Sequence, residues 1–426
     1  MSKLLYNLFL IVYRVGITIV SIWNDKAKTW GTGRKDIFSK IALALGTSNG
    51  KQHTVWMHCA SLGEFEQGRP LLDEIRKASP ASKLIVTFFS PSGYEQRKDY
   101  KGADHVFYLP MDGHNNAKKF IDLINPSLVL WIKYEYWYYY LTELKSRNIP
   151  TLLISATFRE DQRFFNKYGT FWLQMLHTFT HIFLQNSFSA KLLEGINISN
   201  NVTITGDTRF DNVKDIADHF IEVPHIGQFC NGRQTIVAGS TWEDDEAIFK
   251  HYIKTHPQRL LILAPHEVDH ENLQDIKKMF PSSMFYSQLV ENAESNSIPD
   301  ASINVLIIDS IGLLSRLYKY CDVAYVGGGF GDNGLHNILE AAVYGKPVIF
   351  GPETDKNFEA EEMIEAGGAI SIGNALQLEA AINELLDNKV ILEMKGKAAY
   401  DYVQNSAGGT NKIMGYLKLH NLLATS

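Results

Sequence analysis

Short apolar runs alternate with amphipathic stretches along most of the chain, from about residue 54 onward. The runs are nearly continuous in Val, Ile, Leu and Phe, which is typical of strands that are buried on both faces of a sheet. The stretches between them, such as 65–78, 117–124 and 164–179, carry apolar residues at helical spacing. This alternation predicts parallel sheets covered by helices. The strands expected in the first half are 54–60, 83–89, 105–111, 127–132, 151–157, 181–185 and 202–206.

The second half repeats the same pattern, so the fold class we expect is α/β, with two Rossmann-like doubly wound lobes joined near 215–231. The domains expected are 1–28, 29–215 and 216–426, and the last helix, about 412–423, is expected to pack back on the first lobe. Ligands bind at the carboxyl ends of strands in such sheets, which predicts a site in the cleft between the lobes. The strands expected here are 235–239, 259–265, 305–309, 323–327, 347–350 and 369–372.

The first 28 residues differ from the rest and predict an uncleaved membrane anchor. The stretch 4–23 is dominated by apolar and aromatic residues and is interrupted by Arg14. About 20 apolar residues can span a bilayer, but a central Arg is costly there, so a helix lying in the interface competes with a spanning one. No small-residue cleavage site follows, which disfavours a signal peptide. Basic residues after the stretch place the body of the protein on the cytoplasmic side.

The charge distribution and the cysteine content of the chain exclude some classes of function. The chain has 426 residues and a net charge of −6, but residues 1–40 carry +5 and the remainder carries −11. An acidic body with a basic leader argues against a nucleic-acid partner and fits an anionic membrane surface. The three cysteines, Cys59, Cys230 and Cys321, have no metal-ligand spacing. The acidic run 243–246 is typical of a helix first turn rather than of a metal site.

The most informative segment is the glycine-rich run 327–340, which follows an expected strand and precedes an expected helix, 336–344. Five glycines in eight residues let the backbone approach a ligand closely. A helix N-terminus after such a loop favours phosphate, and Glu340 could accept hydrogen bonds from a ribose. The run therefore predicts a nucleotide-sugar site. A tight turn that needs glycines only for packing is the alternative.

Two carboxylates follow strands of the first lobe. Glu64 ends the segment Ser-Leu-Gly-Glu at 61–64, where a helix begins, and we expect the helix dipole to keep it ionised as a general base. Ordinary helix capping by Ser61 and Glu64 is the alternative. Glu135 lies in an aromatic segment after the strand 127–132. Arg209 follows the last strand of this lobe and could stabilise a departing phosphate, or pair with Asp207.

Taken in order, these pieces resemble the 3-deoxy-D-manno-octulosonic acid (Kdo) transferases of lipopolysaccharide synthesis, over nearly the whole chain. The resemblance rests on Ser-Leu-Gly-Glu at 61–64, Thr-Gly-Asp-Thr-Arg-Phe-Asp at 205–211, and Gly-Leu-His-Asn-Ile-Leu-Glu at 334–340 with Gly351 and Pro352. It implies a glycosyltransferase-B fold. It also implies transfer of Kdo from CMP-Kdo to the glucosamine disaccharide of a lipid A precursor, lipid IVA, at the inner membrane. The reaction expected is inverting and uses neither metal nor cofactor.

The resemblance also implies roles for individual residues. Glu64 is the general base, Glu135 has the acidic role, and Arg209 stands where the family usually has Lys. Three positions depart from the family pattern: Lys133 replaces a carboxylate, and His266 and Leu313 replace Arg and Glu near the donor. The positions implied to bind the CMP-sugar donor are Pro265, His266, Ile311, Gly312, Leu313, Gly334, His336, Asn337, Ile338, Leu339 and Glu340.

Three alternatives remain open from the sequence. Non-hydrolysing UDP-N-acetylglucosamine 2-epimerases share the architecture, although the membrane anchor and the Ser-Leu-Gly-Glu loop speak against them. Another glycosyltransferase with a different donor is the nearer rival. The departures at Lys133 and Leu313 motivate a third hypothesis, a catalytically inactive binding protein.

Overall fold

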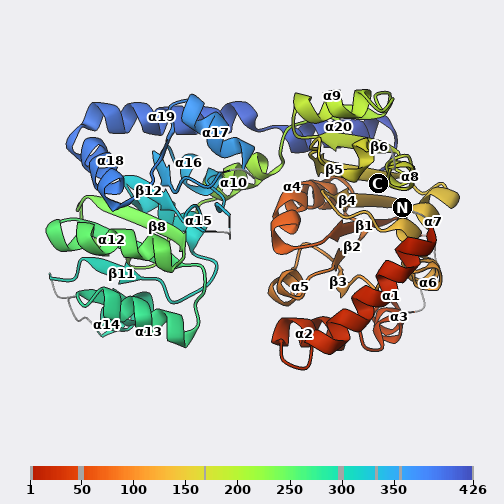
Figure 1. Ribbon diagram of the computed structural model, residues 1–426, viewed down its shortest axis with the longest axis horizontal. Coiled ribbons are helices and arrows are strands. Elements are labelled where there is room, and N and C mark those ends of the chain that lie inside the picture. Colours follow the sequence, from red (N-terminus) through yellow and green to blue (C-terminus); the bar gives the residue numbers. More distant parts are fainter. Residues whose placement is uncertain are drawn as a thin grey trace. The chain divides into compact units, whose positions relative to one another are not determined.

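The computed structural model describes residues 3–46, 52–166, 169–295, 302–331, 334–354 and 357–424. Two residues of the glycine-rich run, Asp332 and Asn333, lie outside these ranges. The chain folds into two compact units (Figure 1). Unit 1 comprises Met1–Asn212 together with Ala407–Ser426, and unit 2 comprises Val213–Ser406.

Unit 1 is built on a seven-stranded parallel sheet of order β3-β2-β1-β4-β5-β6-β7. All seven strands expected in the first half are present, and each ends at most three residues earlier than expected. The α/β fold class is therefore confirmed for this unit. The strands are β1 Thr54–Cys59, β2 Lys83–Phe88, β3 His105–Tyr108, β4 Leu128–Ile132, β5 Thr151–Ala156, β6 His181–Leu184 and β7 Val202–Ile204.

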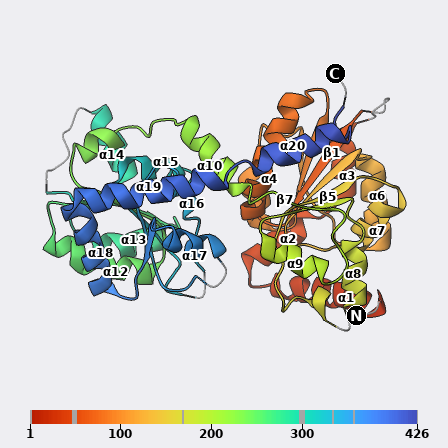
Figure 2. The same ribbon diagram turned by 90° about the horizontal axis from the view of Figure 1, so that it is seen from above.

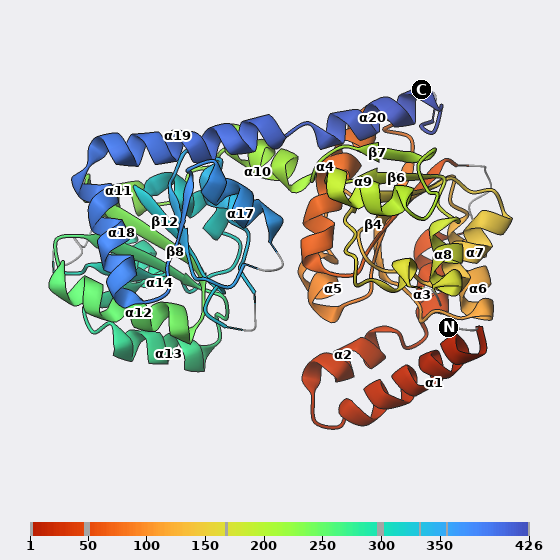
Figure 3. The ribbon, with the colours of Figure 1, turned by 45° about the horizontal axis from the view of Figure 1, so that its top comes forward.

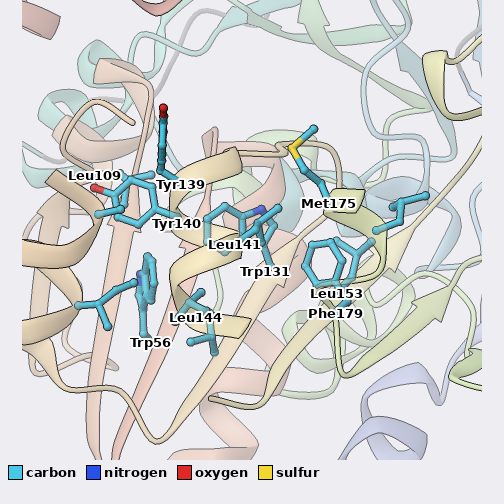
Figure 4. Close-up of a cluster of buried hydrophobic side chains, with 14 of the residues drawn as sticks. Trp56, Leu109, Trp131, Tyr139, Tyr140, Leu141, Leu144, Leu153, Met175 and Phe179 are labelled. Carbon is cyan, nitrogen blue, oxygen red and sulfur yellow. The ribbon is translucent and has the colours of Figure 1, made fainter. Parts of the chain in front are cut away.

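Helices cover both faces of this sheet. Because side chains alternate along β1, Trp56 enters one apolar cluster with Trp131 and Tyr140, while Val55 and Met57 enter the other (Figure 4). The helices of unit 1 are α1 Lys3–Val20, α2 Asp25–Gly33, α3 Ile37–Leu45, α4 Leu62–Ala78, α5 Pro91–Arg97, α6 His114–Ile124, α7 Tyr138–Ser146, η1 Arg163–Phe165, α8 Thr170–Leu176, α9 Ser187–Glu194 and α20 Gly409–Leu419.

Unit 2 has a second seven-stranded parallel sheet, of order β10-β11-β9-β8-β12-β13-β14. The six strands expected here are present, whereas β10 was not predicted because its three residues are too short to show a pattern. The strands are β8 Thr235–Thr241, β9 Leu260–Pro265, β10 Ser283–Phe285, β11 Val305–Ile307, β12 Val323–Val326, β13 Val348–Phe350 and β14 Ala369–Ser371.

The helices of unit 2 lie on both faces of its sheet (Figure 1). Phe249 and Leu385, from two of these helices, join Tyr325 of the sheet in one apolar cluster. The helices of unit 2 are α11 Ile226–Cys230, α12 Glu243–Thr255, α13 His270–Met279, α14 Tyr286–Glu294, α15 Leu314–Leu317, η2 Tyr318–Tyr320, α16 Leu339–Ala342, α17 Phe358–Glu365, α18 Ala375–Asp387 and α19 Lys389–Ser406, and α10 Arg209–Asp218 joins the two units.

Each sheet has one topological switch point, where successive strands are added on opposite sides. In unit 1 the chain runs outward from β1 through β2 to β3 and then returns to the other side of β1 as β4. In unit 2 the corresponding position lies between β8 and β12. The loops at the carboxyl ends of these four strands are therefore the places where ligand-binding residues are expected.

The two ends of the chain both lie in unit 1. Helix α20 packs on α4, and its Ile413, Met414 and Leu417 join an apolar cluster beneath the sheet (Figure 2). Helix α1 runs beside α2 (Figure 3). It is the one helix among the described residues that is long and apolar enough to cross a membrane by length and composition.

Candidate active site

Glu64 lies where the sequence predicts, in the first turn of α4 directly after β1. The helix begins there because the hydroxyl of Ser61 accepts a hydrogen bond from the backbone N–H of Glu64. The carboxylate of Glu64 turns back and accepts from the backbone N–H of Ala60. Ser61 and Glu64 therefore cap the start of α4, as the alternative interpretation of this segment expected. The Glu64 carboxylate also lies at the topological switch point of the sheet.

The expectation that Glu64 stays ionised at neutral pH is wrong for this structure. Burial and the negative charge of Glu135 together raise the pKa of Glu64 to about 8. The charge of Lys133 and the bonds from the backbone act in the opposite direction but do not offset burial. The helix dipole argument failed because Glu64 is only 9% exposed, which sequence reasoning did not anticipate.

Glu135 stands across the same switch point, in the loop between β4 and α7. Its Oε2 accepts from Trp137 Nε1 at 2.8 Å and lies 2.9 Å from Nε2 of the buried His58. Because its charge acts on Glu64, the two carboxylates expected from the sequence belong to one electrostatic site. Lys133 is the residue that departs from the family pattern by replacing a carboxylate. Its positive charge acts on Glu64, so it belongs to the same site.

Lys133 has an unusual backbone. Its φ of 61° places a non-glycine residue in the left-handed region directly after β4. Such backbone strain is held by the surrounding structure and is frequent at functional sites. The ammonium lies 4.9 Å from the centre of the Tyr134 ring, and its charge lowers the pKa of both Glu64 and Asp207.

Arg209 is paired with Asp207, as the alternative interpretation expected. Its Nε donates to Asp207 Oδ2 at 2.8 Å, and its backbone N–H donates to Oδ1 at 2.8 Å. Gln67 and Gln185 donate to the same carboxylate. Burial alone would raise the pKa of Asp207, but the charges of Arg209 and Lys133 hold it below its usual value. Asp207 therefore fixes the guanidinium at the edge of the site, where 21% of the Arg209 side chain is exposed.

In unit 2 the glycine-rich run is held by a buried aspartate that the sequence did not single out. Asp245 Oδ2 accepts from the backbone N–H groups of Gly328 and Trp242, both at 2.9 Å. Its Oδ1 accepts from the hydroxyl of Tyr325 at 2.6 Å. Gly328 has a φ of 91°, which favours glycine. Asp245 thus ties the loop after β12 to the loop after β8.

The helix expected at 336–344 is mostly absent, which corrects the phosphate argument. Only the four residues of α16, Leu339–Ala342, are helical. Asn337 accepts from the backbone N–H of Leu339 and donates to Glu340, and Gly345 ends the turn with a φ of 69°. A single turn has little dipole of its own, so the glycine-rich loop rather than a helix N-terminus is what this region offers to a ligand.

Three aromatic rings meet beside this loop. Trp242 Nε1 donates to His336 Nε2 at 3.3 Å, so His336 is neutral at that nitrogen. The ring of His266 stacks on both, with its centre 4.6 Å from each. Burial and the neighbouring His266 lower the pKa of His336 to about 4. The structure thus brings two of the predicted donor residues together with Trp242, from the loops after β8, β9 and β12.

The remaining predicted donor residues are distributed around these rings. Pro265 ends β9 directly before His266. Gly334, with a φ of 80°, resumes the glycine-rich run. The side chains of Ile338 and Leu339 are fully buried, so any contact of theirs with a nucleotide would involve the backbone. The segment of Ile311, Gly312 and Leu313 follows β11, which is separated from β12 by β9 and β8 in the sheet, and leads into α15, which packs against α16.

Sequence reasoning missed His58, Trp242 and Asp245 as parts of these sites, and it named Asp207 only as a possible partner of Arg209. Trp242 carried a usable signal, since it lies three residues after the predicted strand 235–239. The three others are buried, and only the folded structure shows what their side chains contact. Within the described ranges, no group of three or more His, Cys, Asp or Glu side chains could hold a metal ion.

Several known proteins are related to this chain in sequence. The sequence model of the family described as 3-deoxy-D-manno-octulosonic-acid transferase (kdotransferase) matches residues 36–212. A 3-deoxy-D-manno-octulosonic acid transferase of Haemophilus influenzae is 28% identical over 381 residues, covering 85% of this chain and 86% of that protein. One of Aquifex aeolicus is also 28% identical, over 352 residues, covering 81% and 89%.

Solved structures agree on the fold. The UDP-GlcNAc 2-epimerase of Neisseria meningitidis bound to UDP-GlcNAc superposes with a TM-score of 0.61 at 16% identity, covering 86% of this chain and 100% of that one. At this identity the likeness concerns the two-unit fold and not the activity. The relatives in sequence span most of the chain. The chain is therefore similar in sequence to Kdo transferases over most of its length, and its residues 36–212 match the model of that family.

Proposed function

We propose that this protein transfers Kdo from CMP-Kdo to the glucosamine disaccharide of a lipid A precursor, with inversion and without a metal ion. The observation that carries the proposal is the position of Glu64. It is a carboxylate at the switch point of unit 1, with a pKa of about 8, beside Glu135 and Lys133. A general base works best when its pKa lies near the operating pH.

In the proposed reaction Glu64 takes the proton from an acceptor hydroxyl. The oxygen then attacks the anomeric carbon of Kdo as the bond to the phosphate of CMP breaks. The carboxylate accepts a hydrogen bond from the backbone N–H of Ala60, so it has to leave that N–H to reach the acceptor hydroxyl. Lys133 and Arg209 supply positive charge against the negative charge that develops, an effect that is strong in a buried site.

Unit 2 is proposed to bind the nucleotide of the donor. The loop after β12, held by Asp245, offers close backbone approach, and Trp242, His266 and His336 offer flat rings beside it. Flat rings suit stacking with a base. Neutral His336 accepts from Trp242 at Nε2, which leaves Nδ1–H as a donor for a ligand.

Helix α1 is proposed to lie in the membrane interface rather than to span the bilayer. Tyr6 and Leu10 are buried in unit 1, and the Tyr6 hydroxyl donates to Asp112 at 2.6 Å. A helix docked in this way cannot cross a bilayer. The opposite face exposes apolar side chains, and Arg14 lies along its edge at helical spacing from Lys3 and Asn7. These exposed residues are Leu4, Leu5, Leu8, Ile11, Val12, Val15 and Ile19.

The experiment that tests the proposal incubates the purified protein with CMP-Kdo and lipid IVA in detergent and follows product mass. We expect a product with added Kdo and one CMP released per transfer. Glu64→Gln should lower kcat about 10²–10⁴-fold, since it removes the base but keeps the side-chain shape. The matched control is Glu74→Gln, on the exposed face of the same helix, which should leave kcat unchanged.

Equal rates for the wild type and Glu64→Gln would remove Glu64 from the role of base. Turnover of UDP-N-acetylglucosamine without an acceptor, together with no product from CMP-Kdo, would support the epimerase alternative instead. Nucleotide binding without turnover of either donor would indicate an inactive binding protein.

A further inference from the structure

A chain of hydrogen bonds runs through the buried side of the unit 1 site and ends on Glu135. Trp56 and His58 lie on the same face of β1, since they are two residues apart in a strand. Trp56 Nε1 lies 2.8 Å from Thr87 Oγ1, and His58 Nδ1 lies 2.9 Å from the same oxygen. His58 Nε2 lies 2.9 Å from Glu135 Oε2. Figure 4 shows Trp56 in the surrounding apolar cluster.

The direction of these bonds follows from the donors. An indole N–H can only donate, so Trp56 donates to the Thr87 hydroxyl. The hydroxyl keeps its own hydrogen, and within the described part of the chain its acceptor is His58 Nδ1. In the neutral imidazole the other nitrogen then carries the proton. His58 therefore donates from Nε2 to Glu135.

His58 is fully buried, so neither ring nitrogen can exchange its partner for water. Its ring packs against Trp131 with centres 4.6 Å apart, and Trp131 Nε1 donates to the backbone oxygen of Glu135 at 2.5 Å. Trp137 adds a second donor to Oε2. A buried polar group that loses its hydrogen-bond partner destabilises the folded state, so this set of bonds favours one orientation of Glu135.

We propose that His58 is a positioning residue, whose Nε2–H holds the Glu135 carboxylate beside Glu64, with Thr87 and Trp56 fixing the required tautomer. Nothing in the motif-based interpretation assigns His58 a role. The consequence for catalysis rests on the transfer reaction proposed above, because it is the charge of Glu135 that acts on Glu64. The positioning itself does not depend on which substrate is used.

The test needs a readout of Glu135 that is independent of activity, and Trp137 provides one. We propose 19F NMR of the full-length protein carrying 5-fluorotryptophan, with the Trp137 signal assigned from Trp137→Phe. In His58→Leu the Trp137 signal should move, because Glu135 is no longer held. In His58→Gln, whose Nε2 can still donate, it should stay near the wild-type position. Glu135→Gln gives the reference for a changed partner.

Measurements of enzymatic activity provide a second test of the positioning role. His58→Leu should lower kcat/KM about 10²-fold, as expected when a catalytic group is misplaced, and His58→Gln should recover most of this loss. In the Glu135→Gln background His58→Leu should have little further effect. An unmoved Trp137 signal in folded His58→Leu, or equal and additive losses in the two backgrounds, would overturn the positioning role.

One measurement uses no variant and so cannot fail through misfolding. 15N NMR of the imidazoles in the wild-type protein should show His58 with its proton on Nε2, and a proton on Nδ1 alone would overturn the proposal. If the protein does not transfer Kdo, the NMR results still decide whether His58 holds Glu135. Failure of the proposed function is therefore distinguishable from failure of this inference.

Discussion

Glu64 is acted on by two neighbouring charges of opposite sign. Burial and Glu135 raise its pKa, and Lys133 lowers it. A base whose pKa is about 8 is mainly protonated at pH 7, so its ionised fraction, and with it the rate, increases until the pH exceeds this value. Because Lys133 stands where the resemblance implies a carboxylate, this chain has a positive charge near Glu64 in place of a negative one.

These two charges predict opposite shifts of the pH–rate profile. The acidic limb of kcat/KM should lie near pH 8 in the wild type. Glu135→Gln removes a charge that raises the pKa of Glu64, so the limb should move to lower pH. Lys133→Met removes a charge that lowers it, so the limb should move to higher pH. The measurement is kcat/KM for Kdo transfer between pH 5 and 10, and shifts of the same sign would contradict the assignment of Glu64.

For individual residues, the sequence could predict where the site side chains lie in the fold, but not how deeply they are buried or what they contact. Glu64 and Glu135 follow strand ends, so their shared location was predictable from the strand pattern and the rule for parallel sheets. The pKa of Glu64 depends on how deeply the first turn of α4 is buried. His58 was indistinguishable from an ordinary strand residue, because its partners Thr87 and Glu135 are 29 and 77 residues away.

Among the elements, the glycine-rich loop after β12 shows why a motif can be right about a place and wrong about its geometry. The strand and the loop are present as predicted, but the following helix is one turn long. The sequence 336–344 has helical spacing, yet the helix begins only at Leu339, whose backbone N–H donates to the Asn337 side chain, and it ends at Ala342. The glycines have a packing role as well, since Gly329 lies against the backbone of Gly351.

This close approach predicts different effects for two neighbouring glycines. A Cβ at Gly329 would lie 2.8 Å from backbone atoms of Gly351, and that backbone can move only together with β13. Gly329→Ala should therefore lower the free energy of unfolding by about 1–3 kcal/mol and weaken binding of CMP. The control is Gly331→Ala, where a Cβ meets no described atom within 4 Å. Urea unfolding and calorimetric titration with CMP measure both effects, and equal stability of the two variants would contradict the contact.

On the scale of the whole molecule, helix α1 has two different faces. One face is packed into unit 1 through Tyr6 and Leu10, and the other is apolar and exposed. From the sequence alone, a spanning helix and an interfacial helix were equally open. The residues buried against unit 1 are what favour the interfacial orientation, and they could not be identified before the folded structure placed Tyr6 beside Asp112.

Polar substitutions on the exposed face should release the protein from membranes without unfolding it. Leu8, Val12 and Val15 are each at least half exposed. Replacing all three by Gln should weaken binding to vesicles containing anionic lipids about 10²-fold or more, since each buried apolar side chain contributes about 1.5–3 kcal/mol. Flotation and thermal unfolding would check this. Val390→Gln with Met394→Gln, which changes exposed apolar residues of α19, is the matched control and should leave vesicle binding unaltered.

The position of α20 has a consequence for how the protein is made. Its residues Ile413, Met414 and Leu417 complete the core under the sheet of unit 1, but the ribosome adds them after all of unit 2. Until then Val55, Leu84 and their neighbours lack that cover, and a nascent chain that exposes apolar surface is prone to aggregate. Unit 2, being one continuous segment, can close its own core before synthesis ends. Final folding of unit 1 therefore waits for the last helix, and a premature stop near residue 406 would leave a complete unit 2 attached to an unfinished unit 1.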